Sequence, residues 1–104
     1  MSKLEKVIDS MQTKFNANAA SGLDLTFQFS VEDADAFYVE VENDTCHINK
    51  GEHSSPSVVL KMTSETLIGL MDGSVNGMQA FMDGKLAAEG DIMLATKLGE
   101  LFPA

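Results

Sequence analysis

The most reactive side chains of this sequence lie close together along the chain: Cys46, His47, His53 and the pair Ser54-Ser55. Cysteine and histidine side chains bind zinc, and a cysteine or serine beside a histidine can act as a nucleophile. Cys46 and His47 are neighbours on an expected strand, however, so their side chains point to opposite faces of the sheet. The spacing therefore disfavours both a shared metal ion and a Cys–His nucleophile pair.

The serine and glycine patterns offer no better catalytic site. Ser54-Ser55 stands beside His53, but there is no G-x-S-x-G turn and no third group that can be assigned to this pair. The glycines match neither the G-x-G-x-x-G motif nor a phosphate-binding P-loop. We therefore expect no enzyme activity, no cofactor and no metal site, and we keep a small hydrolase or thioesterase that depends on His53 as an alternative.

The methionines are concentrated in one part of the chain, between residues 62 and 93. Methionine is unbranched and polarizable, so it fills irregular space and adapts to varied apolar partners. The concentration predicts a plastic apolar cavity or groove, although the same residues can also fill the core beneath short helices. They are Met62, Met71, Met78, Met82 and Met93.

The net charge restricts the partners. The 104 residues include 16 acidic and 7 basic residues, which gives a net charge of −9, and every basic residue is a lysine. We expect no nucleic-acid partner, because the chain lacks the positive surface that binds phosphates. We expect no strong binding to anionic membranes for the same reason.

Acidic residues are dense between Glu32 and Glu52, where Lys50 is the one base. Such a stretch is usually a solvated face that keeps the protein soluble. The alternative is that the hairpin 32–52 is a docking surface for a basic protein partner.

Length and apolar content indicate one soluble domain, residues 1–104, since domains typically have about 100–150 residues. No apolar run approaches the ~18 residues of a membrane span. The first ten residues carry charges where a signal peptide needs an apolar core. Cys46 is the single cysteine and cannot form an internal disulfide, which fits a reducing compartment. We therefore expect a free-standing cytoplasmic protein.

The apolar pattern alternates between helical and extended periods along the chain. An amphipathic helix comes first, strands follow in a run, and most helices come late. The pair Asn43-Asp44 forms a tight turn between two strands, although the usual glycine is missing. This order predicts an α+β fold, with a five-stranded, mostly antiparallel sheet and helices packed on one face. The expected elements are helix 2–19, strands 23–31, 37–42, 45–49 and 58–62, helices 65–71 and 76–82, strand 85–89 and helix 91–102.

The final expected helix is apolar around roughly half of its circumference, more than the ~100° that a surface helix needs. Two interpretations fit: the helix is deeply wedged in the core, or it covers an apolar ligand. Phe102 lies near the end of the chain, where fraying is normal, so this end is a candidate lid.

Five short segments of the C-terminal half occur in a characteristic order. They are VVLKMT at 58–63 with an acidic residue after it, residues 67–73 ending in Asp72-Gly73, MQAFMDGKL at 78–86, EGD at 89–91 and LATKL at 94–98. In this order and spacing they resemble the sterol carrier protein 2 (SCP2) family of sterol-transfer or lipid-binding domains. The resemblance covers about residues 4–102.

The resemblance implies a five-stranded sheet covered by helices on one face, with a hydrophobic tunnel between the sheet and the C-terminal helices. It also implies binding of fatty acids, fatty acyl thioesters, phospholipids or sterols without catalysis. The sequence departs from the family at two points: it has no tryptophan in the first strands, and it is acidic where the animal carriers are basic.

We expect the ligand to contact apolar side chains on both walls of this tunnel, because an apolar ligand is held mainly by the hydrophobic effect. Gln79 is the candidate partner for a polar headgroup, and Gln28 and Lys85 are weaker candidates. The expected ligand-binding residues are Phe27, Phe29, Leu60 and Met62 on the sheet, with Leu67, Met71, Met78, Gln79, Phe81, Met82, Leu94, Leu98 and Phe102 on the helical side.

Two classes of function besides lipid binding or transfer remain at this point. The first is a non-catalytic interaction or dimerisation module that works beside lipid-metabolising enzymes and docks through the acidic hairpin 32–52. The second is the small hydrolase described above.

Overall fold

The computed structural model describes residues 3–90 and 92–102. Two long strands, β1 (Leu25–Val31) and β2 (Phe37–Glu42), form where apolar and polar residues alternate. Because side chains of a strand point alternately to opposite faces, the alternation places one apolar set on a single face of the sheet. Phe27 and Phe29 of β1 and Val39 of β2 have no exposed surface.

Three shorter strands complete the sheet: β3 (Thr45–Lys50), β4 (Val58–Met62) and β5 (Ala87–Gly90). β2 and β3 are joined through Asn43 and Asp44, which have φ angles of 51° and 63°. This confirms the expected tight turn without glycine, since two consecutive residues with positive φ are typical of a two-residue hairpin turn.

The strands lie in the order β3-β2-β1-β4-β5. β1 pairs with β4 in parallel, and the other neighbours are antiparallel. The parallel pair brings the carboxyl ends of β1 and β4 to the same edge, where the Glu32 N–H donates to the Met62 carbonyl at 2.9 Å. A mostly antiparallel, five-stranded sheet is confirmed.

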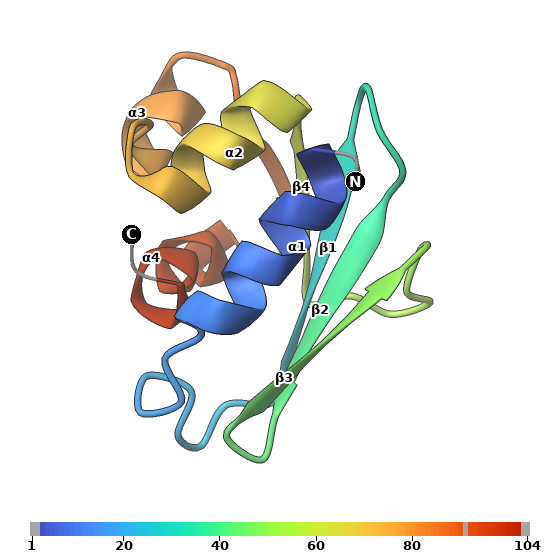
Figure 1. Ribbon diagram of the computed structural model, residues 1–104, viewed down its shortest axis with the longest axis vertical. Helices are drawn as coiled ribbons and strands as arrows, with labels where there is room; N and C mark the ends of the chain where they lie inside the picture. Colours follow the sequence, from blue (N-terminus) through green and yellow to red (C-terminus); the bar gives the residue numbers. More distant parts are fainter. Residues whose placement is uncertain (1–2, 91, 103–104) are drawn as a thin grey trace.

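The helices cover one face of the sheet and leave the other face without a helical layer (Figure 1). This confirms the α+β fold with helices on one side. We call the covered face the inner face and the opposite one the outer face. The helical segments are α1 (Lys3–Lys14), α2 (Ser64–Asp72), α3 (Gly77–Met82), the 3₁₀ helix η1 (Ile92–Lys97) and α4 (Leu98–Leu101). None of the helices in the described ranges has the length and apolarity that a membrane crossing requires.

The first helix is shorter than expected, since α1 ends at Lys14 rather than near residue 19. The Asn16 side-chain oxygen accepts hydrogen bonds from the backbone N–H groups of Asn18 and Ala19, and this local bonding competes with the helix. The Asn16 N–H donates to the Leu101 carbonyl at 2.7 Å, so the chain after α1 is tied to the C-terminal segment.

The last segment is not the single α-helix that the sequence predicts. It is a 3₁₀ helix that packs against β4 and β5, followed by one turn of α-helix. The expected helix cap at residue 91 lies outside the described residues. β5 also begins later than expected, because the N–H groups of Lys85 and Leu86 donate to the Ala80 carbonyl and close the end of α3 first.

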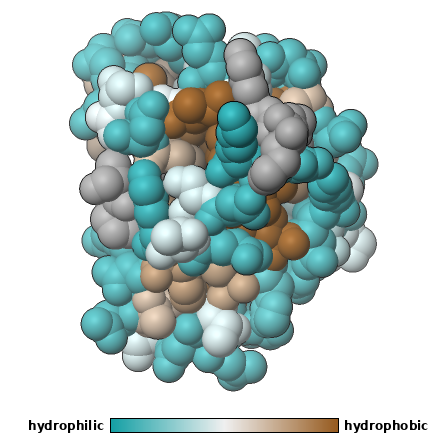
Figure 2. Space-filling view, viewed as in Figure 1, coloured by the Kyte–Doolittle hydropathy of each residue, from teal (hydrophilic) through white to brown (hydrophobic). Residues whose placement is uncertain are grey.

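The core fills the space between the inner face and the helices. Phe29 and Phe37 stack with ring centroids 4.8 Å apart. Phe15, just after α1, contacts Phe102 near the end of the chain, with centroids 5.7 Å apart. Hydrophobic residues also reach the surface over α2 and beside α1, with hydrophilic residues around them (Figure 2).

Candidate functional site

An apolar layer lies between the inner face of the sheet and the helices, where the tunnel is expected. The two sheet strands at its centre are β1 and β4, and their register places Phe27 opposite Val58, Phe29 opposite Leu60 and Val31 opposite Met62. Seven of the expected ligand-binding residues are buried in this one hydrophobic cluster: Phe27, Phe29, Leu60, Met62, Leu67, Met71 and Phe102.

Two further expected residues belong to the C-terminal segment. Leu94 is half-buried and packs against the same cluster. The side chain of Leu98 lies outside the described part of the structure.

The four expected residues of α3 lie elsewhere. Met78, Phe81 and Met82 share one side of the helix, as predicted, but this side faces outward, with 62%, 44% and 74% of these residues exposed. Gln79 is also exposed, and its side-chain amide donates to the Asp83 carboxylate at 3.0 Å. Ala80, which is buried, is the residue through which α3 packs on the core.

A pocket of about 440 Å³ opens beside the carboxyl ends of the parallel strands β1 and β4, near the start of α2. The pocket is widely open to solvent and is not an enclosed cavity. The lining residues come from β4, α2 and β5, from the residue after β1, and from the segments before and after α3: Glu32, Lys61, Thr63, Glu65, Thr66, Val75, Gly84, Lys85 and Ala87.

One wall of the pocket is formed by the first turn of α2, which is capped by a residue of its own sequence. Thr63 is the N-cap of α2, and its hydroxyl oxygen accepts from the Thr66 N–H at 3.2 Å. The same hydroxyl donates to the Thr66 hydroxyl at 3.1 Å. These bonds satisfy polar groups that would otherwise be left open at the helix N-terminus.

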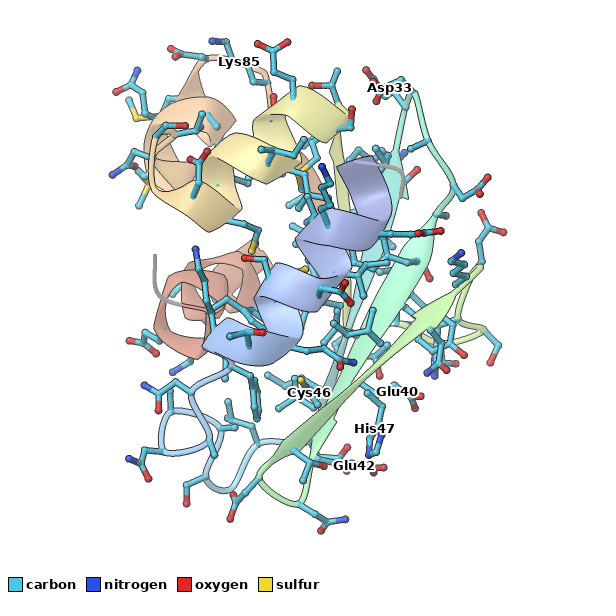
Figure 3. All side chains as sticks on the ribbon, viewed as in Figure 1. Asp33, Glu40, Glu42, Cys46, His47 and Lys85 are labelled. Carbon is cyan, nitrogen blue, oxygen red and sulfur yellow. The ribbon has the colours of Figure 1, made fainter. Side chains whose placement is uncertain are left out.

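Both signs of charge line the pocket. Lys61 forms an ion pair with Glu89, Nζ to Oε1 3.2 Å, across the β4–β5 ladder. Lys85 projects from the upper end of the molecule in the view of Figure 3, at the same end as Asp33. Glu32 and Glu65 supply the negative charges. The pocket therefore combines an apolar side, formed by Val75 and Ala87, with ionic groups at its rim.

Among the residues that line this pocket, Lys85 is the one that the sequence named as a ligand contact, as a weaker candidate for the polar headgroup. The missing information is the parallel pairing of β1 with β4, because this pairing brings the carboxyl ends of the two strands, and with them residues 32 and 63, to the same edge of the sheet.

Gln28, the other weaker headgroup candidate, lies on the outer face and its amide is fully engaged. Its Nε2 donates to the carbonyls of Phe37 and Gly51, each at 3.1 Å. Its Oε1 accepts from the His53 N–H at 2.7 Å. Gln28 therefore fixes the loop 51–57 to the outer face and is not available to a ligand on the inner face.

The reactive residues lie on opposite sides of the sheet: His53 and Ser55 are in the loop 51–57 at the outer face, and Cys46 of β3 packs against the core on the inner face. His53 Nδ1 accepts from the Ser55 N–H at 3.0 Å, and its Nε2 lies 3.8 Å from Glu40 Oε2. Cys46 is half-buried, and this burial raises the pKa of its thiol. Within residues 3–90 and 92–102, no three His, Cys, Asp or Glu side chains are grouped as a metal site.

The acidic hairpin has an uneven distribution of charge. Lys50 is the one base of the hairpin, and its Nζ lies 3.8 Å from Oε1 of Glu5 in α1, on the helical side of the sheet. Glu40, Glu42 and His47 lie together away from the helices (Figure 3). In the register of β2 with β3, Glu40 is opposite His47, and Glu42 is opposite Thr45. The outer end of this hairpin is therefore predominantly acidic.

Comparisons with known proteins agree on one family. The model of the SCP-2 sterol transfer family matches residues 4–103. Hydroxysteroid dehydrogenase-like protein 2 of Xenopus laevis is 31% identical over 103 residues, which cover 96% of this chain and 25% of that protein. The chain therefore spans about a quarter of the length of this curated relative.

Solved structures show the same fold. The palmitated SCP2L2 of Aedes aegypti, determined by solution NMR, superposes with a TM-score of 0.76 at 22% identity, covering 100% of this chain and 96% of that one. The apo form of sterol carrier protein 2 from Yarrowia lipolytica gives a TM-score of 0.69 at 20% identity, covering 94% of this chain and 91% of that one.

Proposed function

Since this chain belongs to the SCP-2 sterol transfer family, a family of lipid-binding domains, we propose that it binds fatty acids, fatty acyl thioesters or sterol-like molecules between the sheet and its helices. The observation that carries the proposal is the continuous apolar layer on the inner face, in which seven expected contact residues are buried together. The fold shared with a palmitated protein supports this choice of ligand class.

The apolar part of the ligand contacts Phe29 and Leu60 on the sheet and Leu67 and Met71 on α2. These side chains pack against one another, so a lipid tail enters only as the helices move away from the sheet. Apolar contact of this kind has little directionality, so the ligand range is broad. A bound ligand stabilises the folded state by mass action.

The polar end of the ligand lies in the pocket beside β4 and α2. Thr66 lines this pocket and is itself buried, and Leu67, the next residue of α2, is buried in the inner layer. Lys85 is the cation proposed to face the carboxylate of a fatty acid or the anionic group of a fatty acyl thioester. Catalysis by this chain forms no part of the proposal.

Calorimetric titration and thermal unfolding with palmitate and with hexadecanol test the proposal. We expect both lipids to bind wild-type protein and to raise its melting temperature. Lys85→Glu weakens palmitate binding by about two- to fivefold, the factor that an exposed ion pair of up to ~1 kcal/mol supplies, and leaves hexadecanol unaffected. Lys97→Glu, the same charge change outside the pocket lining, is the matched control.

Two negative outcomes are distinct. If neither lipid binds wild-type protein, the proposed function is wrong. If palmitate binds equally to wild type and Lys85→Glu, lipid binding stands and the position of the polar end is wrong.

A second proposal follows from the charge distribution of hairpin 32–52. Because Lys50 pairs with Glu5 on the helical side, the outer end of the hairpin presents Glu40 and Glu42 to a basic partner. A lysine-rich peptide should then bind at low salt, and Glu40→Lys with Glu42→Lys should abolish this binding. Binding that persists in the double variant would place the basic partner elsewhere.

A further inference from the structure

The outward side of α3 is unusual for the surface of a soluble protein. Met78, Phe81 and Met82 stand at positions i, i+3 and i+4, so they form one apolar stripe, which we call the α3 stripe. Single exposed apolar residues are ordinary, whereas three large ones side by side on a six-residue helix form a contiguous apolar patch, and such patches are often functional.

The helix presents this stripe rigidly. Ala80, on the opposite side of α3, is 1% exposed, and its carbonyl accepts from the N–H groups of both Lys85 and Leu86. Asn76 caps the start of the helix by accepting from the Gln79 N–H at 3.1 Å. The exposure of the stripe is therefore set by the packing and the caps of α3.

The size and charge of the stripe indicate whether a protein or a lipid surface covers it. Three side chains expose at most a few hundred Å², far below the roughly 800 Å² per partner of a stable protein interface. α3 contains no charged residue, so its insertion into a headgroup layer buries no ion. The net charge of −9 repels an anionic bilayer.

The position of α3 relative to the pocket points to a lipid surface. Val75, before α3, and Gly84 and Lys85, after it, all line the 440 Å³ pocket. A surface that receives the stripe therefore lies beside this pocket.

We propose that the α3 stripe inserts into the interface of an electrically neutral, zwitterionic phospholipid bilayer, and that the protein exchanges its ligand there. The exchange and the choice of a lipid surface both rest on the proposed function, because the pocket beside α3 is where that proposal places the polar end of the ligand. Methionine adapts its shape to its surroundings, and neither methionine nor phenylalanine carries a charge, so three such side chains make a weak and reversible contact.

Sedimentation with phosphatidylcholine vesicles tests the insertion. The triple variant Met78→Ser, Phe81→Ser, Met82→Ser should lose at least about tenfold in vesicle partitioning, since each buried apolar side chain contributes to the contact. Met93→Ser, which changes an exposed methionine of η1, is the matched control and should partition as wild type does. Vesicles containing phosphatidylglycerol should bind wild type less than neutral ones.

Four outcomes would overturn the inference: no partitioning of wild type, equal partitioning of the triple variant, stronger binding to anionic vesicles, or an equal loss in Met93→Ser. A dimer of wild type in analytical ultracentrifugation that the triple variant lacks would instead assign the stripe to a second copy of the chain. Thermal unfolding of the triple variant checks that it folds.

Palmitate binding measured without vesicles separates this inference from the proposed function. The triple variant should bind palmitate in solution as wild type does, because its substitutions are exposed. Vesicle binding without palmitate binding would leave the insertion standing and refute the exchange of ligand.

Discussion

Gly90 ends β5 in a position that no other residue can occupy without strain. Its φ is +95°, and a Cβ atom there would lie 2.9 Å from the Ser57 carbonyl oxygen and 3.4 Å from the Val58 Cα. Both atoms belong to the backbone, so neither can rotate away. Gly90→Ala should therefore weaken the pairing of β5 with β4, which places Gly90 opposite Val58.

The expected cost has two parts. A left-handed backbone costs a residue with a Cβ about 1–2 kcal/mol. Forcing backbone atoms apart adds a cost like that of overpacking, about 1–3 kcal/mol. Gly90→Ala should thus lower the free energy of unfolding by about 2–5 kcal/mol, and each kcal/mol lowers the melting temperature of a domain of this size by roughly 4–8 °C.

Gly84 provides the matched control. Its φ is +78°, but a Cβ there would have no atom within 4 Å. Gly84→Ala should therefore cost only the backbone term of about 1–2 kcal/mol. The measurement is urea unfolding of the three proteins followed by circular dichroism. If Gly90→Ala is no less stable than Gly84→Ala, the close approach of β5 to Ser57 is not present in solution and the reasoning fails.

Three further predictions concern the hairpin turn, the cap of α2 and the thiol. Asp44→Gly should raise the free energy of unfolding by up to about 1 kcal/mol, because the cost of a φ of 63° to a residue with a Cβ, about 1–2 kcal/mol, exceeds the entropic cost of glycine, about 0.4–1 kcal/mol. A loss of stability in urea unfolding would contradict the turn geometry. Thr63→Ala should lower the free energy of unfolding by about 1 kcal/mol in the same assay, since the Thr66 N–H loses its acceptor. Thr13→Ala, on the exposed side of α1, is the comparison. An equal effect of the two substitutions would argue against the cap. Burial raises the pKa of the Cys46 thiol, so its thiolate forms, and iodoacetamide reacts, at higher pH than with a free cysteine; a pH midpoint at or below the ordinary value would refute this.

The sequence by itself determined the order of most elements and the apolar side of each. Alternation in β1 and β2 specified the inner face, since a strand has a period of two. The sequence offers Thr63 or Ser64 as the cap of α2 and Asp72-Gly73 as its end, because a hydroxyl at the N-cap and a glycine after the last turn are local signals. The structure selects Thr63 as the cap, and Gly73 ends the helix with a φ of 86°. The stripe of Met78, Phe81 and Met82 was also evident from its helical spacing.

Only the tertiary structure decided what these faces meet. The parallel pairing of β1 with β4, and hence the pocket at their carboxyl ends, depends on a contact between segments about thirty residues apart, which local periodicity does not encode. The α3 stripe points outward because α3 packs on the core through its opposite side, where the small residue Ala80 is buried. An amphipathic pattern specifies an apolar side, but packing against the rest of the chain decides whether that side lies in the core or on the surface.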